Sequence, residues 1–471
     1  MKITKTVQDF ELNSFEKVYV LDTNIVLSDV KNVEILSQGS SNLIILPETM
    51  LDEVDSKKSG FEEINFMARE FGRLLESASV TQMAKIDGVV INRCVIEGNS
   101  NITIDIISKE TYKCDEDRST ERNVLNDRKI IEVALFAQEH YKTEKTDVIF
   151  VSLDVMCRQR ALSLGLSTES FGKMNDFNPE FYKEFDIQEL NLDSFPSTLE
   201  NFQEMTNLEK SVSSVCLYDD KGNKKYYVKS GLTFFLIDDK ELEKQNIKPL
   251  NIQQKILSTL MLDNFNNVVV CEAAAGTGKT VTAISAAMKL IDQKMSPYDK
   301  IVYIRKTIIS SDIELGFLPG SLEEKMMGYL APLYSNLEAI VMRKFSSSKK
   351  KFTEDEMKDK ILELISDYRI TSMWQGHLRG TTIRNAIVIY DEIQNDNISD
   401  IRTTISRMGE NCKVFCLGSL KQIDNKYVNK HTSALTFLLK KLNEDNEINV
   451  VGAHLTNSVR SKMAEWADSF K

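Results

Sequence analysis

The sequence predicts an α/β protein with two parallel-sheet domains and a small β segment between them. Short apolar runs alternate with helix-forming stretches in both halves of the chain, and such runs are typical of parallel strands that helices cover on both faces. The runs are KVYVLD, NLIILP and DVIFVSLD in the first half and NVVVCEA, KIVYIRK, NAIVIYDE and CKVFCLGS in the second. The 471 residues also exceed the roughly 250–300 that a single hydrophobic core holds, which indicates two or three domains.

The chain is expected to divide into residues 1–175, a linker with a small β segment at 176–244, and residues 245–471. Residues 176–210 are polar and contain the turn-forming sequence SFPS, which is typical of a linker. The following stretch SSVCLYDDKGNKKYYVKSGLTFFLID predicts a hairpin, because two β-rich runs flank the turn-forming DDKGNK. The α/β alternation returns at Pro249.

Composition excludes several classes of protein. The formal charge of -11 disfavours a chain that coats nucleic acid over its whole surface, although local basic patches remain compatible with it. The seven cysteines are scattered without a C-x-x-C pair, so reduced thiols are expected rather than a zinc site or a disulfide framework. No stretch approaches the roughly 18–20 apolar residues of a membrane span, which predicts a cytoplasmic protein without a membrane partner.

The segment CEAAAGTGKT predicts a phosphate-binding loop between a strand and a helix. It follows NVVV and precedes VTAISAAMKLI, and its core residues are Ala275, Gly276, Thr277, Gly278, Lys279 and Thr280. Glycines let backbone N–H groups close around phosphates, the lysine supplies a cation to the β and γ oxygens of ATP, and the threonine hydroxyl suits Mg²⁺. The full pattern has glycine where this chain has Ala273, a change that the loop is expected to tolerate with nucleotide affinity affected.

A second motif, AIVIYDEIQN, places Asp391 and Glu392 at the end of an apolar strand. Asp391 is expected to hold Mg²⁺ through water, and Glu392 to orient or activate the attacking water. A small-molecule kinase needs no residue that activates water, so the adjacent glutamate favours ATP hydrolysis over phosphate transfer.

Four acids in the first half predict a site for Mg²⁺ or Mn²⁺. Asp22 and Asp154 follow apolar strands, Glu53 lies near a helix start, and Asp127 precedes an amphipathic helix. Each acid alone is more typical of a helix cap or a solvated strand end. Together they favour a metal site, because clustered carboxylates repel one another unless divalent ions neutralise them, and two such ions can cleave a phosphodiester.

The second half resembles the PhoH-like ATPases, which are related to superfamily 1 helicases, over about residues 245–471. Besides EAAAGTGKT and YDEIQN, the resemblance rests on LGFLPGSLEEKMMGYLAPLY, LRGTTIRNAIVIYDE, RMGENCKVFCLGSLKQID and SVR. It implies an adenine-reading Gln254, and a sensor role for Gln422 and Asp424. It also implies cations directed at the γ-phosphate or at a neighbouring subunit: Arg379, Arg407 and Arg460. The chain departs from the family at Ser419, where an aspartate is usual, and a serine carries no charge for the sensor role.

The first half resembles the PIN-domain nucleases over about residues 16–172. DTN, Glu53, ND and SLD supply the four acids of that family in order, and Ser152 occupies its hydroxyl position. Asn24 and Arg128 are expected to be support residues, with a turn asparagine and a surface arginine as the alternative.

The two resemblances together imply an ATP-dependent RNA helicase or translocase coupled to a metal-dependent ribonuclease. They imply single-stranded RNA as the partner and a homo-oligomer, in the form of a hexameric ring. The basic residues considered for the RNA path are Lys306, Lys325, Arg343 and residues 349–351, although exposed lysines usually serve solubility.

Two other readings of the sequence stay open. In one, the chain is an ATPase whose PIN module binds RNA without cleaving it. In the other, it is a scaffold that ATP binding switches and that processes no nucleic acid.

Overall fold

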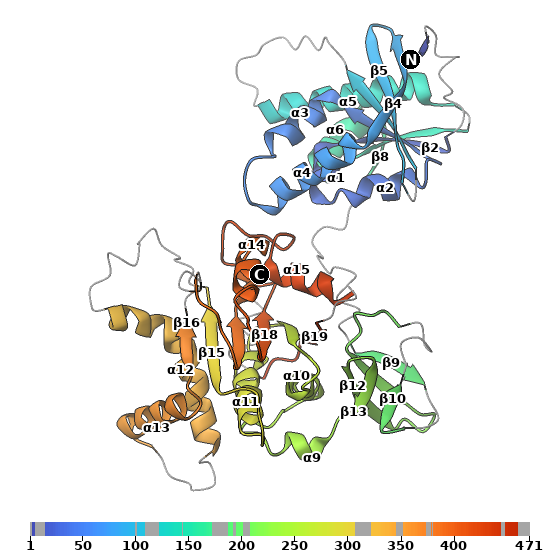
Figure 1. The fold of residues 1–471 in the computed structure, drawn as a ribbon. Coiled ribbons are helices and arrows are strands. Elements are labelled where there is room, and N and C mark those ends of the chain that lie inside the picture. The colour runs from blue at the N-terminus through green and yellow to red at the C-terminus, as the bar shows by residue number, and fades with distance from the viewer. Residues whose placement is uncertain are drawn as a thin grey trace. The chain divides into compact units, whose positions relative to one another are not determined.

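A computed structural model describes the chain in two compact units, Met1–Phe177 and Asn178–Lys471 (Figure 1). The residues it describes are 2–4, 15–98, 101–108, 122–143, 145–171, 187–191, 195–200, 208–306, 322–344, 352–373, 378, 380–443 and 448–459. Within these ranges, no helix combines the length and the apolar character that crossing a bilayer requires.

The first unit is built on an eight-stranded sheet in the order β1-β4-β5-β6-β3-β2-β7-β8. Its strands are β1 (Lys2–Thr4), β2 (Lys17–Leu21), β3 (Leu43–Pro47), β4 (Ala78–Ile86), β5 (Val89–Ile96), β6 (Ile102–Ser108), β7 (Asp147–Val151) and β8 (Ser167–Glu169). Its helices are α1 (Thr23–Ser28), α2 (Lys31–Ser37), α3 (Glu48–Ser56), α4 (Glu63–Glu76), α5 (Arg122–Tyr141) and α6 (Val155–Ser163).

The sheet of the first unit is parallel from β6 through β3, β2 and β7 to β8. The predicted parallel sheet is therefore present, but β4, β5 and β6 pair antiparallel, an addition that the amphipathic residues of this region did not reveal. Strands β2 and β7 are direct neighbours, with Leu21 opposite Val151. Residues that follow these two strands must consequently lie side by side.

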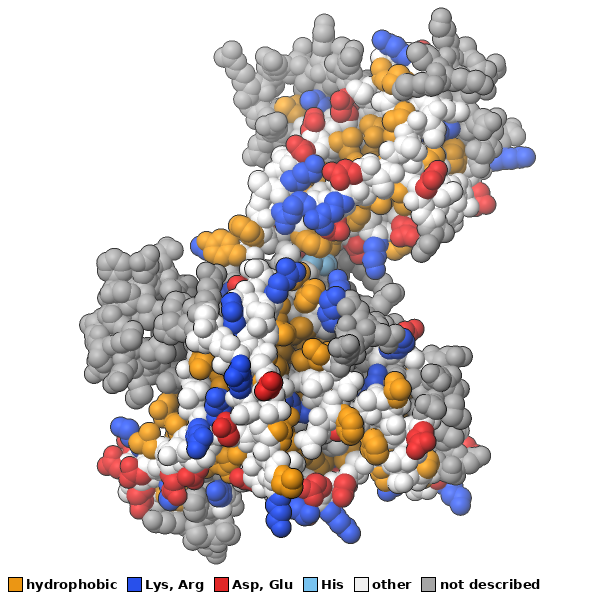
Figure 2. Space-filling model, viewed as in Figure 1, with side chains coloured by type: hydrophobic (Ala, Val, Ile, Leu, Met, Phe, Trp, Pro, Cys, Tyr) orange, Lys and Arg blue, Asp and Glu red, His pale blue; other side chains and the backbone are white. Residues whose placement is uncertain are grey.

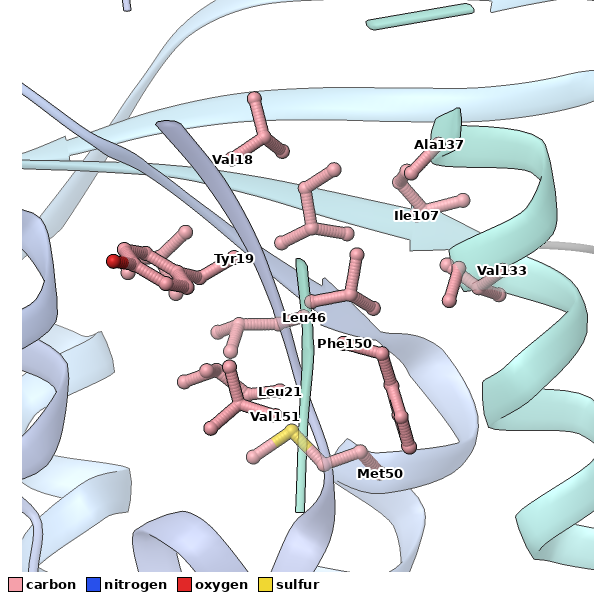
Figure 3. Packing of buried hydrophobic residues seen from close by; sticks show 14 of the residues in the cluster. Val18, Tyr19, Leu21, Leu46, Met50, Ile107, Val133, Ala137, Phe150 and Val151 are labelled. Atoms are coloured by element: carbon pink, nitrogen blue, oxygen red, sulfur yellow. The ribbon is translucent and has the colours of Figure 1, made fainter. Parts of the chain in front are cut away.

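The core of the first unit explains why its central strands read as continuous apolar runs. All five residues of β3 are buried, as are residues 18–21 of β2, because helices cover both faces of the sheet. Figure 3 shows Leu46, Phe150 and Met50 packed against one another in this layer. Burying each such side chain stabilises the fold by about 1.5–3 kcal/mol, so the strand ends are held rigidly.

The second unit begins with a five-stranded sheet in the order β10-β13-β12-β11-β9. Its strands are β9 (Gln188–Asn191), β10 (Thr198–Glu200), β11 (Ser214–Tyr218), β12 (Lys224–Ser230) and β13 (Thr233–Leu236), and α9 (Asp239–Leu242) follows. The predicted hairpin is confirmed as β11 and β12, with Val215 opposite Tyr227. The sheet is larger than that hairpin and has a small core of its own around Tyr227 and Phe234.

A six-stranded, fully parallel sheet forms the rest of the second unit, in the order β16-β15-β17-β18-β14-β19. Its strands are β14 (Val268–Ala273), β15 (Lys300–Arg305), β16 (Thr371–Met373), β17 (Ala386–Asp391), β18 (Cys412–Gly418) and β19 (Val450–Leu455). Its helices are α10 (Ile252–Leu262), α11 (Lys279–Ile291), α12 (Leu322–Lys344), α13 (Glu354–Asp367), α14 (Ile398–Ile405) and α15 (Ala434–Lys440), with a short 3₁₀ turn at Ile393–Asn395.

All four strands predicted for the second half are present in this sheet. Strand β18 lies between β14 and β17. The loop that follows β18 therefore starts between the glycine-rich loop after β14 and the acidic pair at the end of β17.

Candidate functional sites

The four predicted acids of the first unit gather at the carboxyl edge of its sheet. Asp22 follows β2, Asp154 comes three residues after β7, and helices α3 and α5 carry Glu53 and Asp127. Burial raises the pKa of Asp22 to about 6, and the charges of Asp127 and Glu53 add to the rise. Burial likewise raises the pKa of Asp127, with further contributions from Asp154 and Glu53. The structure thus brings together all four acids as one electrostatic group.

Asp22 is held by residues that the sequence indicated. Its carboxylate accepts hydrogen bonds from Ser152 Oγ at 2.6 Å and from Asn24 Nδ2 at 2.7 Å. Asn24 Oδ1 in turn accepts from the backbone N–H of Leu153 at 2.9 Å. The serine and the asparagine therefore orient Asp22 between the ends of β2 and β7.

Three further residues contact Glu53 and Asp127, and no sequence motif had assigned them a role. Glu53 accepts from Thr23 Oγ1 and, at 2.6 Å, from Asn126 Nδ2. Arg160 of α6 donates to Asp127 at 3.0 Å. Thr23 and Asn126 are each adjacent in sequence to a predicted acid, and that position could have indicated them. No sequence pattern indicates Arg160, because only the fold brings it to Asp127. Arg128, the predicted support residue, is exposed, and the arginine that contacts Asp127 is Arg160.

The four carboxylates are chemically suited to bind a divalent cation, but they do not form a preformed metal site. Carboxylate oxygens are ligands that Mg²⁺ and Mn²⁺ prefer, and the mutual repulsion of these acids favours a bound cation. Asp127, however, pairs with Arg160, and Asp154 caps α6 by accepting from Met156 N at 2.7 Å. Among the described residues, no group of three Asp, Glu, His or Cys side chains is arranged so that it could hold a metal ion. To bind the ion, the Asp127 carboxylate would have to release its ion pair with Arg160.

In the second unit, the glycine-rich loop has the backbone that its sequence predicts. Gly276 and Gly278 have φ of 70° and 78°, the left-handed region that glycine adopts without steric cost. A Cβ on Gly278 would also lie 2.9 Å from Gln254 Nε2. Ala273 ends β14 as a buried strand residue, a conformation that alanine adopts without strain. The loop leads into the start of α11, with Gly278 as its N-cap, and the N-terminus of a helix binds anions favourably.

The predicted phosphate and Mg²⁺ residues converge at the start of α11. Thr280 Oγ1 donates to Asp391 at 3.1 Å, and Tyr303 OH donates to the same carboxylate at 2.8 Å. Lys279 Nζ lies 3.6 Å from Glu392 Oε1. Burial raises the pKa of Asp391, and the neighbouring charge of Glu392 raises it further. Glu392 has φ of 58°, an uncommon backbone for a non-glycine residue and one that tends to occur at functional sites.

Gln254, predicted to read adenine, uses its amide to brace the glycine-rich loop. The side chain is 4% exposed, and its Nε2 donates to Thr277 O at 2.8 Å. Its Oε1 accepts from the backbone N–H of Leu250 at 2.7 Å. In this conformation, both ends of the amide are bound within the protein.

The predicted arginines fall in different places. Arg407 O accepts from the N–H of Ile383, which precedes β17, so Arg407 lies at the amino edge of the sheet. The six residues of β17 span about 20 Å from the amino edge to the carboxyl edge of the sheet. Because the glycine-rich loop lies at the carboxyl edge, Arg407 is separated from it by about this length within one chain. Arg407 therefore does not contact the phosphate site of its own chain. Arg379 and Arg460 lie outside the described residues.

The basic residues considered for an RNA path receive little support. Lys306 Nζ pairs with Asp400 at 2.6 Å and with Asp396 at 3.0 Å, so its charge is neutralised within the unit. Arg343 is exposed on α12. Residues 349–351 and the side chain of Lys325 lie outside the described part.

A buried glutamine that the sequence did not indicate, Gln394, joins the acidic pair to the loop after β18. The residue is fully buried. Its Nε2 donates to Glu392 Oε2 at 2.6 Å and to Gln422 O at 2.8 Å, and its Oε1 accepts from Ser419 N at 3.1 Å. The predicted sensor residue Gln422 thus takes part through its backbone, while its side chain is exposed.

Comparisons with known proteins match both units. A model described as "PhoH-like protein" matches residues 246–470, and a PIN domain model matches residues 19–172. Protein PhoH2 of Bacillus subtilis (strain 168) is 28% identical over 441 residues, which are 90% of this chain and 93% of that protein. Protein PhoH2 of Thermobispora bispora is 24% identical and covers 90% of both chains. Protein PhoH of Escherichia coli (strain K12) is 28% identical over 200 residues, which are 42% of this chain and 51% of that protein.

Proposed function

We propose that this chain, which joins a PIN domain to a PhoH-like domain, is an ATP-driven RNA helicase or translocase coupled to a metal-dependent ribonuclease. The observation that carries the proposal is the meeting of Thr280 with Asp391, beside Lys279 and Glu392. This pairing of a glycine-rich loop with a strand-end Asp-Glu is what nucleotide hydrolysis requires. The four acids of the first unit supply the second chemistry.

In the ATP site, Thr280 and Asp391 would hold Mg²⁺, which neutralises charge on the phosphates. Lys279 would bind the β and γ oxygens, and the N–H groups of the loop would surround them. Because Lys279 lies beside Glu392 without nucleotide, a bound γ-phosphate would draw the lysine away from that carboxylate. Glu392, held by Gln394, would then orient the attacking water.

In the acid site, Asp22, Glu53, Asp127 and Asp154 would hold Mg²⁺ or Mn²⁺, which activates a water for phosphodiester cleavage. Ser152 and Asn24 keep the carboxylate of Asp22 oriented. The pKa of about 6 leaves Asp22 ionised at neutral pH, as a metal ligand must be. All four acids of the PIN pattern are present, which favours cleavage over an RNA-binding module without activity.

The partner in this proposal is single-stranded RNA, which the ATPase delivers to the acid site. The protein would act in the cytoplasm as a homo-oligomer, in the form of a hexameric ring. In such a ring Arg407 would face the nucleotide of a neighbouring subunit, as would Arg460 or Arg379. Native mass measurement with and without ATP tests this part.

Two substitutions in the full chain test the proposal. Lys279→Ala should abolish ATP hydrolysis while cleavage of labelled RNA in Mn²⁺ persists, and Asp22→Asn should have the opposite effect. Matched controls are the exposed residues Lys294→Ala and Asp52→Asn, which remove the same charges from the same units. Retention of each activity in its own variant would sink the assignment.

The same experiment separates the alternatives. RNA cleavage that is absent in the unmodified chain, with RNA-stimulated ATP turnover present, would indicate a PIN module that only binds RNA. ATP binding without RNA-stimulated turnover would indicate a nucleotide-switched scaffold. Loss of Mn²⁺-dependent cleavage in Glu53→Gln would exclude the binding-only module.

A further inference from the structure

The loop between β18 and α15 carries a concentration of positive charge next to an exposed aromatic ring. Residues 421–431, called the basic loop below, read KQIDNKYVNKH and contain three lysines, a histidine and a single acid, Asp424. Lys421 and Lys426 are exposed, and Tyr427 is 56% exposed. In a chain with a formal charge of -11, such a segment is a local exception that can attract an anion.

The basic loop lies at the functional edge of the sheet. It begins three residues after β18, the strand between β14 and β17, so it starts between the glycine-rich loop and the acidic pair. Ligands of open α/β sheets bind at this carboxyl edge. On the face shown in Figure 2, Lys and Arg predominate at the α14–α15 end of the second unit, whereas Asp and Glu gather over α13. Basic side chains are therefore visible at this edge, and others lie at the opposite end of the unit.

The basic loop is anchored in the core of the unit. Val428 is 5% exposed and fixes the middle of the loop. Asn429 Oδ1 accepts from the N–H groups of His431 and Thr432 at 2.9 and 3.0 Å, which closes a turn. Lys426 Nζ lies 5.3 Å from the centre of the Tyr427 ring. The loop thus presents a positioned ring with a cation beside it.

Buried side chains tie the start of the basic loop to the ATP site. Asn395, 2% exposed, accepts from Asp424 N at 2.8 Å and from Asn425 N at 3.2 Å. Gln394 bridges Glu392 and Gln422 O. One continuous set of hydrogen bonds therefore joins the carboxylate that faces Lys279 to the basic loop.

The P-loop strand holds the same segment from the other side. Glu272 of β14 accepts from the backbone N–H of Leu420 at 3.3 and 3.4 Å. Leu420 immediately precedes the basic loop. Movement of either phosphate-site segment would consequently be transmitted to residues 419–425.

We infer that the basic loop is a contact for single-stranded RNA, in which the lysines bind phosphates and Tyr427 stacks on a base. This inference rests on the proposed function, because it assigns the RNA contact of the same ATPase. Lysines alone would suit any polyanion, but a ring fixed among them suits bases, since every base offers a flat face to an aromatic side chain. The hydrogen bonds through Gln394 and Asn395 make the contact sensitive to nucleotide. By reciprocity, RNA bound there changes ATP affinity by the same factor.

The test measures RNA binding by the full chain with a non-hydrolysable ATP analogue and a fluorescent oligouridylate. The Lys421→Ala/Lys426→Ala variant should weaken binding and lower the slope of log affinity against log salt by about 1.4, since each phosphate contact on a single strand contributes about 0.7. Tyr427→Ala should weaken binding by about tenfold, and Tyr427→Phe should retain it because the stacking face remains.

The matched control is Lys294→Ala/Lys358→Ala, which removes two exposed lysines of the same unit from the β15 approach and from α13. It should leave affinity and salt slope unchanged, and circular dichroism verifies that each variant folds. Unchanged RNA binding in the Lys421→Ala/Lys426→Ala and Tyr427→Ala variants would overturn this inference and leave the proposed function standing. Failure of the unmodified chain to bind RNA would overturn the proposed function. Competition by polyglutamate as effective as by oligouridylate would show a generic polyanion surface and would also overturn the inference.

Discussion

Replacing Glu272 by glutamine should stabilise the second unit at alkaline pH, although the change removes a charged side chain from the strand that leads into the glycine-rich loop. The side chain is 4% exposed near the end of β14 and accepts the hydrogen bond of Leu420 N. Burial raises the pKa of Glu272 from 4.5 to about 7, and the bond from Leu420 offsets only part of the rise. The folded protein is therefore penalised for ionising this carboxyl group.

The size and the sign of the effect follow from that pKa. Because the folded pKa lies above the unfolded value, the penalty is absent below about pH 4.5, grows between 4.5 and 7, and is complete above 7. The interval from 4.5 to about 7, at about 1.4 kcal/mol for each pH unit, corresponds to about 3 kcal/mol. Glutamine can still accept from Leu420 N, but its amide adds buried donors that cost about 1–2 kcal/mol. A net stabilisation of about 1–2 kcal/mol is expected at pH 8.

Denaturant unfolding at several pH values measures this effect. Hydrogen exchange of peptides from β14 and β18, measured by mass spectrometry, reports the unfolding of the second unit separately from the first. The free energy of unfolding of Glu272→Gln should exceed that of the unmodified chain at pH 8. The difference should fall to zero or below by pH 5, because the glutamate is then largely protonated while the cost of the buried amide donors remains.

The control is Glu410→Gln, which removes an exposed carboxylate of the same unit and should change the free energy of unfolding little at any pH. A Glu272→Gln variant that is equally destabilised at pH 5 and pH 8 would refute the reasoning. That result would mean that the carboxylate is stabilised by its hydrogen bonds more than burial penalises it.

Three further predictions each concern one side-chain contact. Gln394→Leu should lower kcat for ATP by about tenfold or more with little change in KM, because Glu392 loses its positioning donor; steady-state kinetics checks this, and a change in KM alone would contradict it. Arg160→Gln should enlarge the rise in Tm that Mn²⁺ causes, since Asp127 is released, and a smaller rise in differential scanning fluorimetry would show that the arginine instead organises the site. Arg93 of β5 pairs with Asp105 of β6 at 2.7 Å, and the Asp105 side chain is fully buried. Arg93→Met should destabilise the first unit by about 3–5 kcal/mol in denaturation followed by circular dichroism, because it leaves the Asp105 carboxylate without its cation. A neutral result would show that this carboxylate is protonated in the folded protein.

Local patterns in the sequence were sufficient for the central strands of the two parallel-rich sheets and for the phosphate-binding motif. Runs such as NVVVCEA and NAIVIYDE appear as β14 and β17, since a strand covered on both faces needs apolar residues throughout. The positions of Gly276 and Gly278 were equally legible, because left-handed backbone has few alternatives to glycine. Motif spacing also identified Thr280 and Asp391, which the fold brings to 3.1 Å.

The neighbours of each functional residue were decided only by the tertiary structure. Which strand lies beside which depends on pairing between distant segments, and no local period encodes it. The placement of β18 between β14 and β17 connects Gln394 to Ser419, and the amino-edge position of Arg407 removes it from its own ATP site. The packing of α6 beside α5 likewise gives Asp127 an arginine partner. The sequence therefore determined the candidate side chains for the proposed chemistry. Long-range packing determined which partners orient them, because hydrogen bonds and charges act through space rather than along the chain.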